Sequence, residues 1–294
     1  MDKDLKNRNN LILNRAAFTV VCASIDDRST IEQFFARNHL AFKAAGQLFD
    51  LRVVLVHQDM SLLAGWSPFP GNVAGNIILL PQRGLSMARN FALRDMRSGW
   101  MLFLDIDCNL DEDFFENLHR LQEAKGDVDV FVGQVMSLQT GKGILRRWPT
   151  KAKRMHLWDG LQLALSVNAV YRVPDPMLMF DERFGLGAQF GSCEDVDYFL
   201  MYCGKKYYSP NLRIYHPELD FLSMPDRKRE SYSYGFGAFV RKRFGYLGVV
   251  LIALSILKKT PLFLAGRLSG RSWWRVSASQ FYGFFDYTLR DVKR

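Results

Sequence analysis

Short apolar runs alternate with longer amphipathic segments along the first half of the chain. The runs, rich in β-branched and aromatic residues, occupy positions 19–23, 51–56, 76–80, 100–104 and 128–132. Continuous runs of this kind are typical of strands buried on both faces of a sheet. Apolar positions at helical spacing cover residues 31–47 and 85–96. The pattern predicts an α/β fold, with helices flanking a mostly parallel, Rossmann-like sheet.

The second half of the chain changes in character. Residues 161–173 are apolar, and a glycine-containing loop follows over residues 179–191. The spacing predicts a helix from residue 194 to 202 and a last strand from 207 to 216. Beyond Pro225 the composition becomes basic and aromatic. We therefore predict a main α/β domain over residues 1–225 and a helical extension over residues 226–294.

The composition is that of a globular protein. Of the 294 residues, 48% are hydrophobic and 23% are charged. The four cysteines have no CxxC spacing, which argues against a zinc site or a disulfide framework and favours a reducing compartment. Residues 1–15 are polar and lack the apolar core of a signal peptide, so we expect no secretion by that route.

Positive charge is concentrated at the C-terminal end. Residues 227–294 hold 14 Lys or Arg against 3 Asp or Glu, whereas the whole chain carries a net charge of +9. Such asymmetry indicates a basic tail that meets an anionic partner, which leaves nucleic acid, anionic lipid and a phosphorylated acceptor open.

Acidic residues follow several of the predicted strands. Asp26, Asp59 and Asp105 lie after the first, second and fourth runs, and ligands of parallel α/β sheets bind outside the carboxyl ends of the strands. Asp105 and Asp107 stand two residues apart, a spacing that places both carboxylates on one face of a strand. Such a pair can hold a divalent ion that neutralises a diphosphate. The alternative is a loop with two solvated aspartates.

Three further features extend this site. Gly84 and Ser86 suit a loop that leads into a helix N-terminus, where anions are favoured. Arg83 is a candidate to contact a pyrophosphate, and Arg89 to pair with a phosphate or with the acid after the second strand. The alternative is a surface arginine beside a capping serine.

Downstream, Glu194, Asp195 and Asp197 lie at the start of a predicted helix. Acids there are favoured by the helix dipole, so capping explains at least one of them. A carboxylate base is the other use, since sugar transfer must deprotonate an acceptor hydroxyl. His216 follows the last strand as a metal ligand or as a structural histidine.

These features, in this order, resemble the family 2 glycosyltransferases, and in particular members that act in bacterial polysaccharide synthesis. The resemblance runs from Phe18 to His216 and rests on residues 18–24, 83–90, 103–107, 180–184 and 194–197. It implies the GT-A fold and an inverting transfer from a nucleotide-diphosphate sugar with Mn²⁺ or Mg²⁺. The acceptor it implies is a hydroxyl of a glycan or lipid-linked glycan, in cell-surface polysaccharide synthesis.

The resemblance also implies residue roles. Asp105 contacts the nucleotide, Asp107 holds the metal, Asp195 is the general base and Glu194 shapes the acceptor side. Two residues, Ser24 and Asp59, line the base-and-ribose pocket, and His216 matches a late histidine near the metal. The chain departs from the family at residues 25–28, which lack the usual Tyr-Asn pair, and at residues 57–59, which replace paired acids. The nucleotide base is therefore left open.

The C-terminal extension contains an uncharged segment over residues 246–257, ended by Lys258 and Lys259. A membrane-spanning helix needs about 20 apolar residues, so this segment is short for one. Basic residues with flanking Trp and Tyr favour a helix in the interface of an anionic leaflet. The resulting expectation is a cytoplasmic protein, peripheral on the inner face of the cell membrane. The alternative is a helix buried against the main domain.

Other classes of function fit less well. A sugar-nucleotide pyrophosphorylase needs a glycine-rich loop with a lysine after the first strand, and residues 24–30 contain no glycine. A nucleic-acid-binding protein would explain the basic tail but not acids at the strand ends, so we expect no nucleic-acid partner. A non-catalytic protein that binds membranes through its basic tail is the remaining alternative.

Overall fold

The computed structural model describes residues 15–59, 66–70, 73–218 and 222–287. The polar segment for which we expect no signal-peptide function lies almost entirely outside the described residues. The chain divides into two compact units. One is formed by Met1–Gln82, Ala88–Met179 and Tyr202–Glu218, and the other by Arg83–Met87, Phe180–Met201 and Leu219–Arg294. The boundary predicted near residue 225 falls inside the second unit, and the two predicted domains stay a prediction.

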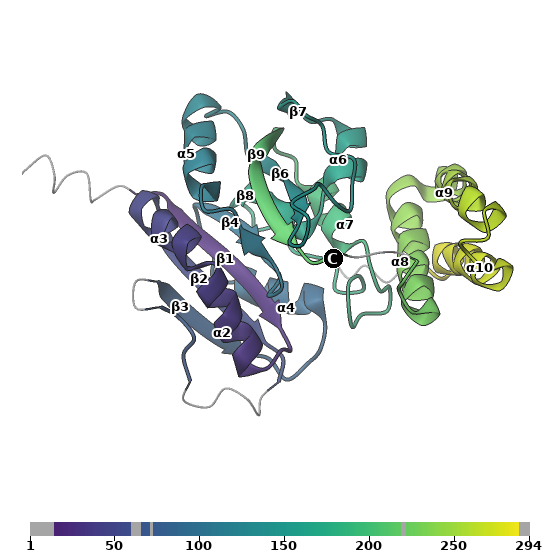
Figure 1. The fold of residues 1–294 in the computed structure, drawn as a ribbon, viewed down its shortest axis with the longest axis horizontal. Helices are drawn as coiled ribbons and strands as arrows, with labels where there is room; N and C mark the ends of the chain where they lie inside the picture. Colours follow the sequence, from purple (N-terminus) through teal and green to yellow (C-terminus); the bar gives the residue numbers. More distant parts are fainter. Residues whose placement is uncertain (1–14, 60–65, 71–72, 219–221, 288–294) are drawn as a thin grey trace, which may run out of the picture. The chain divides into compact units, whose positions relative to one another are not determined.

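A single sheet forms the centre of the first unit, with strand order β3-β2-β1-β4-β8-β6-β9-β5 and β7 paired with β9 (Figure 1). Neighbours among the first four strands are parallel, as are β6 and β9, whereas β8 runs antiparallel to both of its neighbours. The mostly parallel α/β fold is therefore confirmed. The strands are β1 (Ala17–Ser24), β2 (Asp50–His57), β3 (Ala74–Leu79), β4 (Trp100–Phe103), β5 (Asn109–Leu110), β6 (Val130–Ser137), β7 (Lys153–Arg154), β8 (Ala169–Arg172) and β9 (Lys206–His216).

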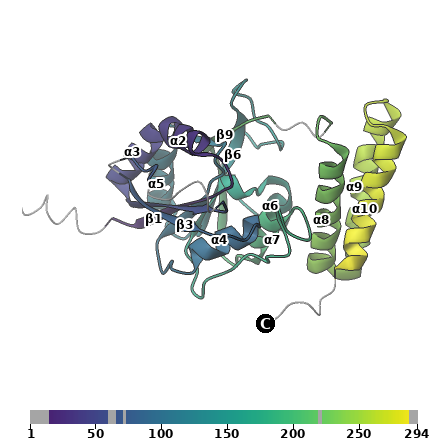
Figure 2. The same ribbon diagram turned by 90° about the horizontal axis from the view of Figure 1, so that it is seen from below.

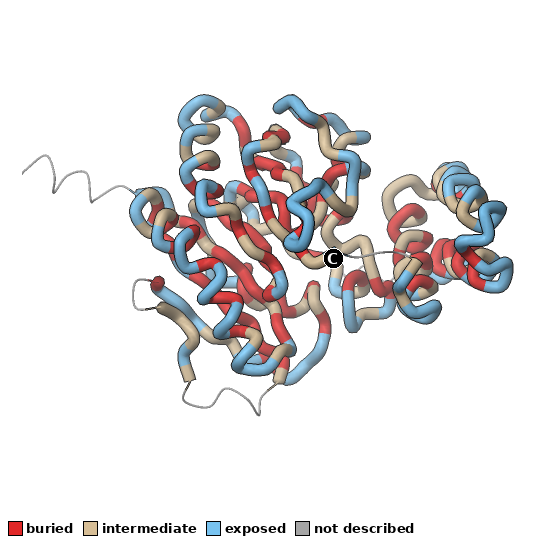
Figure 3. The backbone as a smooth tube through the Cα atoms, in the orientation of Figure 1, coloured by how far each residue is buried: buried red, intermediate tan, exposed pale blue. Residues whose placement is uncertain are grey.

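Helices cover both faces of this sheet. Figure 2 shows α2, α3 and α5 on one face and α4 on the other. Alternate residues of β1, such as Phe18 and Val20, are fully buried in a core with Phe34, Phe42 and Phe115 of α2, α3 and α5, as the two-residue period of a strand requires. The buried strands stand out in Figure 3. The helices are α2 (Arg28–Arg37), α3 (His39–Leu48), α4 (Leu85–Leu93), α5 (Phe114–Ala124) and α6 (Leu157–Leu163).

The single helix predicted over residues 31–47 is wrong, because the chain breaks it at Asn38. The Asn38 side chain is fully buried. Its amide donates to the carbonyl oxygen of Cys108 at 3.1 Å, and its oxygen accepts from the N–H of Leu110 at 2.8 Å. A buried amide stays in place only when it is hydrogen-bonded. Asn38 therefore joins the α2–α3 corner to the start of β5.

The second unit is mainly helical, with α7 (Glu194–Met201), α8 (Asp226–Phe244), α9 (Gly248–Leu264) and α10 (Gly270–Asp286). Helices α8 and α10 approach closely, because a Cβ at Gly237 would overlap the carbonyl oxygen of Gln280 and one at Gly283 that of Tyr234. Gly245, with φ 57°, ends α8, and α9 packs back against it through Gly248. The predicted helical extension is therefore a packed group of helices.

Candidate active site

The carboxyl ends of the parallel strands carry the predicted nucleotide-site residues of the first unit. Strand register aligns Ser24 with His57, and His57 with Leu79. The N–H of Leu104 then donates to the carbonyl oxygen of Val21 at 2.9 Å, which brings Asp105 to the same edge. This is the edge at which parallel α/β sheets bind their ligands.

His57 organises the loops at this edge, a role that sequence reasoning missed. Its ring is fully buried, with one nitrogen 2.8 Å from the carbonyl oxygen of Asp59 and the other 2.9 Å from that of Asp26. Ser24 Oγ donates to the Asp26 carboxylate at 2.8 Å. The ring therefore fixes the backbone next to both predicted pocket residues, Ser24 and Asp59. A histidine ending a buried strand was the available signal.

Arg89 holds Asp105. Its guanidinium is 2% exposed and lies 3.2 Å from Asp105 Oδ1. It also stacks over the Phe103 ring, with 5.6 Å between the guanidinium carbon and the ring centroid. The acid it meets is thus the one after β4. A buried arginine that pairs with a carboxylate fixes the direction of that carboxylate, which stays 38% exposed.

Asp107 and His216 form the candidate metal site. Strand β9 pairs with β5 so that Tyr215 lies opposite Asn109, and this register brings the next residue, His216, towards Asp107. His216 Nε2 lies 3.7 Å from Asp107 Oδ2. His216 Nδ1 is 2.6 Å from the carbonyl oxygen of Pro217, which can only accept a hydrogen bond. This contact turns the other ring nitrogen, Nε2, towards Asp107, the arrangement in which a histidine binds a metal through Nε2.

Cys108 is the third group within reach of this pair, since the ligand atoms of Asp107, Cys108 and His216 lie within 4.8 Å of one another. Burial raises the pKa of the Cys108 thiol well above its usual value, and Asp105 and Asp107 add to the shift. The thiol therefore stays protonated at neutral pH. Because metals bind the thiolate, Asp107 and His216 are the better ligands.

The pKa of Asp107 itself is raised by partial burial; His216 opposes the shift and Asp105 adds to it. Two carboxylates close together disfavour each other's charge. A divalent cation at Asp107 relieves this repulsion, and the mixed carboxylate and imidazole donors suit Mn²⁺. The residues present therefore fit the predicted metal.

The predicted base lies in the second unit, at the N-terminus of α7. Glu194 and Asp195 are half-buried, whereas Asp197 is fully buried. Asp195 Oδ1 accepts a hydrogen bond from the N–H of Val196 at 2.8 Å. Glu194 lies against Gly185, whose positive φ of 103° favours glycine at this position. Both acids thus lie in the first turn of α7.

The Arg83 loop belongs to the same unit. Ser86 Oγ donates to the carbonyl oxygen of Phe184 at 2.6 Å, and the N–H of Leu85 donates to that of Leu186 at 2.9 Å. Arg83 itself is exposed. The second unit thus gathers Arg83, Glu194 and Asp195, and the first gathers Ser24, Asp59, Arg89, Asp105, Asp107 and His216.

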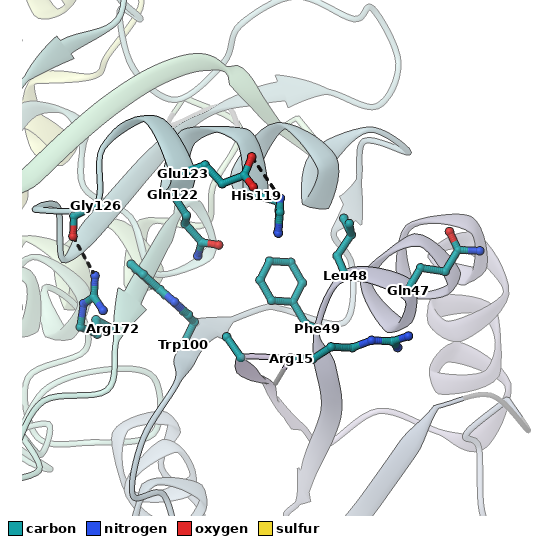
Figure 4. A pocket seen from close by; sticks show the side chains of 11 residues that line it. Arg15, Gln47, Leu48, Phe49, Trp100, His119, Gln122, Glu123, Gly126 and Arg172 are labelled. Carbon is teal, nitrogen blue, oxygen red and sulfur yellow. Dashed lines mark hydrogen bonds and ion pairs between the residues drawn. The ribbon is translucent and has the colours of Figure 1, made fainter. Parts of the chain in front are cut away.

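A cavity of about 710 Å³ lies at the other end of the strands (Figure 4). It is lined by Ala16, just before β1, and by Trp100, the first residue of β4, together with Phe49, His119 and Arg172. Predicted site residues are not among its lining residues. The cavity therefore lies apart from the strand ends that carry the candidate site.

Residues 74–181 match the model of glycosyl transferase family 2. Comparison with curated proteins gives no match. Solved structures with a similar fold include Staphylococcus aureus TarS 1–349, at 14% identity and a TM-score of 0.57 over 90% of each chain. The same fragment was also solved with UDP-GlcNAc, at 13% identity and a TM-score of 0.55 over 90% of each chain. Another is the mannosyltransferase PcManGT from Pyrobaculum calidifontis, in complex with GDP-Man and Mn²⁺. It has 14% identity and a TM-score of 0.58 over 95% of this chain and 89% of the other.

The matched segment contains Arg83, Arg89, Asp105 and Asp107, which belong to two of the five segments that carry the resemblance. The fold agrees, since the similar structures share the α/β sheet with its flanking helices. This match favours a glycosyltransferase over the pyrophosphorylase considered from sequence. Within residues 74–181 the chain is thus similar to glycosyl transferase family 2, and as a whole it has the GT-A fold of the similar structures.

Proposed function

We propose that the protein is an inverting glycosyltransferase that uses a nucleotide-diphosphate sugar and a divalent metal. The 3.7 Å approach of His216 Nε2 to Asp107 Oδ2 carries this proposal, because it brings two possible metal ligands together beside a nucleotide-site acid. Asp107 and His216 would hold Mn²⁺ or Mg²⁺. When bound, the metal stabilises the negative charge of the departing diphosphate. Similar structures hold UDP-GlcNAc, or GDP-Man with Mn²⁺, which supports this donor class.

Asp195 acts as the general base in this proposal. The acceptor hydroxyl gives its proton to Asp195 as its oxygen bonds to the anomeric carbon, while the bond from that carbon to the diphosphate breaks. One displacement inverts the anomeric centre. Ser24, Asp59 and Asp105 bind the nucleoside, and Arg83 faces the diphosphate, whose charge is the largest electrostatic demand of the transition state. Glu194 borders the acceptor.

Donor turnover tests this proposal. Nucleoside diphosphate release is measured with UDP-GlcNAc, other UDP and TDP sugars and GDP-mannose, with and without Mn²⁺, for wild type and the variants Asp107→Asn and Asp195→Asn. We expect turnover of one donor class that requires Mn²⁺. Asp107→Asn should lose the Mn²⁺-dependent turnover, and Asp195→Asn should lose turnover by a factor of about 10³ while keeping donor affinity. Turnover indifferent to metal and to both variants contradicts the proposal.

The acceptor we propose is a hydroxyl of a glycan or lipid-linked glycan used in cell-surface polysaccharide synthesis. Its placement at a membrane is supported by exposed side chains of α9 and of Leu247, the residue just before it. Leu247, Val250, Leu254, Leu257 and Leu264 are 80%, 60%, 56%, 64% and 76% exposed. The first four recur every three or four residues and Leu264 follows two helical turns later, so they form one apolar stripe. Soluble proteins seldom expose a stripe of this kind without a partner.

Among the described residues, Asp226–Leu264 is long and apolar enough to cross a membrane, with a mean hydropathy of 1.9 in its best window, of which 11% is buried. Gly245 divides this stretch into two helices that fold back on each other. This hairpin, with exposed Trp274 and Tyr282 in α10, favours a surface lying in the lipid interface. We place the protein in the cytoplasm, peripheral on the inner face of the cell membrane.

A further inference from the structure

A buried group of opposite charges joins α7 to α8 in the second unit. Asp197 of α7 is 1% exposed, and Lys242 Nζ lies 2.7 Å from its Oδ2. The same nitrogen lies 2.8 Å from Asp181 Oδ2. Arg243 Nε donates to Asp197 Oδ1 at 2.6 Å, and its Nη2 donates to the backbone carbonyl oxygen of Asp197 at 2.9 Å. Arg243 therefore holds the backbone of α7 as well as the side chain.

Three basic side chains face two carboxylates in this group. Asp181 also pairs with Arg183 at 2.8 Å. Burial by itself would raise the pKa of Asp181, but hydrogen bonds from Arg183 and Lys242 hold it far below its usual value. A buried carboxylate is tolerated only with such partners, and removal of one partner leaves an uncompensated charge. The two carboxylates, Asp181 and Asp197, are therefore expected to keep these basic partners in the folded protein.

The residues just before α7 are fixed on α8 too. Ser192 Oγ donates to the backbone carbonyl oxygen of Tyr232 at 2.9 Å. A Cβ at Gly235 would come within 2.7 Å of the Ser192 backbone nitrogen. Helix α8 thus contacts the chain on both sides of Glu194 and Asp195, at Ser192 and at Asp197.

We infer that Asp197, with Lys242 and Arg243, is a positioning residue for glycosyl transfer. It holds the first turn of α7 on α8, so that Asp195 and Glu194 keep one orientation. The inference rests on the proposed role of Asp195. The last turn of α8 holds three basic residues, Arg241, Lys242 and Arg243. Arg241 stacks on Tyr246 with 3.7 Å between its guanidinium carbon and the ring centroid, so all three have contacts within the second unit.

The test compares full-length Asp197→Asn, Arg243→Gln and the double variant that removes both charges. Glu230→Gln is the matched control, because Glu230 also lies in α8 and pairs with Arg275 of α10 at 3.0 Å. Each is measured for thermal unfolding, for Mn²⁺-dependent binding of the nucleoside diphosphate of the preferred donor, and for kcat and KM with that donor. Misplacement of a catalytic group by about 1 Å lowers the rate by about 100-fold.

We expect a kcat reduced by about 10- to 100-fold in both single variants, with nucleotide affinity and donor KM within about twofold. The double variant should be no worse than the singles, because the two residues act as one unit. Glu230→Gln should match wild type.

A folded Asp197→Asn with wild-type kcat overturns the inference. If the single variants do not fold, the double variant decides: a folded double with normal kcat, or one that also fails to fold, assigns the group to folding alone. Asp195→Asn separates this result from the proposed function. An active Asp195→Asn refutes the base assignment, whereas an inactive one beside an active Asp197→Asn refutes only the positioning role.

Discussion

Two side chains of the candidate active site are oriented by neighbours that are not themselves candidate ligands. The Pro217 carbonyl oxygen orients the ring of His216, and buried Arg89 orients the carboxylate of Asp105. Asp107 receives less support, being 55% exposed and having its pKa raised by partial burial. The residue that we expect to bind the cation is thus the one that the metal-free protein accommodates least well.

Asp107→Asn should therefore stabilise the metal-free protein. Because the pKa of Asp107 is higher in the folded than in the unfolded state, its charge opposes folding at neutral pH. Protonation removes the penalty, so the advantage of the asparagine variant should shrink as the pH falls from 7 towards about 4, the usual pKa of an aspartate. Thermal unfolding at several pH values measures this. In contrast, Mn²⁺ should raise the Tm of wild type only. A variant less stable than metal-free wild type contradicts the prediction.

At the scale of the element, the start of α7 combines function with strain. Cys193, the residue before Glu194, has φ 72°. This left-handed conformation is disfavoured for residues that carry a Cβ and favours glycine. The strain lies directly beside the two acids to which we assign acceptor chemistry, as is common at functional sites.

Replacing Cys193 by glycine should relieve this strain. Compared with Cys193→Ala, which also removes the thiol but keeps the Cβ, Cys193→Gly should be more stable by about 1 kcal/mol. Denaturant unfolding of the two variants measures the difference. Equal stability of the alanine and glycine variants would show that the surrounding contacts, and not the backbone, set the energy at this position.

How far the sequence predicts the elements depends on whether the information is local. The apolar runs predicted the strands β1 to β4, and the helical spacing of apolar residues predicted α7 with its end displaced by one residue. The break at Asn38 was missed, because it depends on hydrogen bonds to Cys108 and Leu110, far along the chain. The same holds for the candidate site. Strand-end acids are visible locally, whereas the bonds of His57 and the pairing of Asp197 with Arg243 need the folded chain.

At the scale of the whole molecule, the C-terminal helices have two faces with different roles. The basic end of α8 contacts acids of its own unit, and α9 exposes its apolar stripe. The sequence predicted an anionic partner from the positive charge of this region, but part of that charge pairs with acids inside the second unit. We therefore expect insertion of apolar side chains to contribute more to membrane binding than charge does.

Flotation with phosphatidylcholine vesicles, with and without phosphatidylserine, tests this expectation. Wild type should float with both, with only modest weakening in high salt. Replacing Val250, Leu254 and Leu257 by glutamate should abolish flotation and leave the Tm within a few degrees of wild type, because these side chains are exposed. The matched control replaces Leu157 and Trp158 of α6 by glutamate, because these side chains are 54% and 60% exposed. Wild type that stays in the unbound fraction with both lipids contradicts the membrane proposal.

The pairing of β5 with β9 has a consequence for how the protein is made. Asp107 precedes β5, whereas His216 ends β9, so the two ligands come from distant parts of the chain. Both compact units are also assembled from separate segments. During synthesis, a ribosome must therefore release most of the polypeptide before either the cation site or the unit that carries Asp195 is complete. Incomplete chains should lack the site altogether, so a prematurely terminated product cannot compete for donor or metal in the cell.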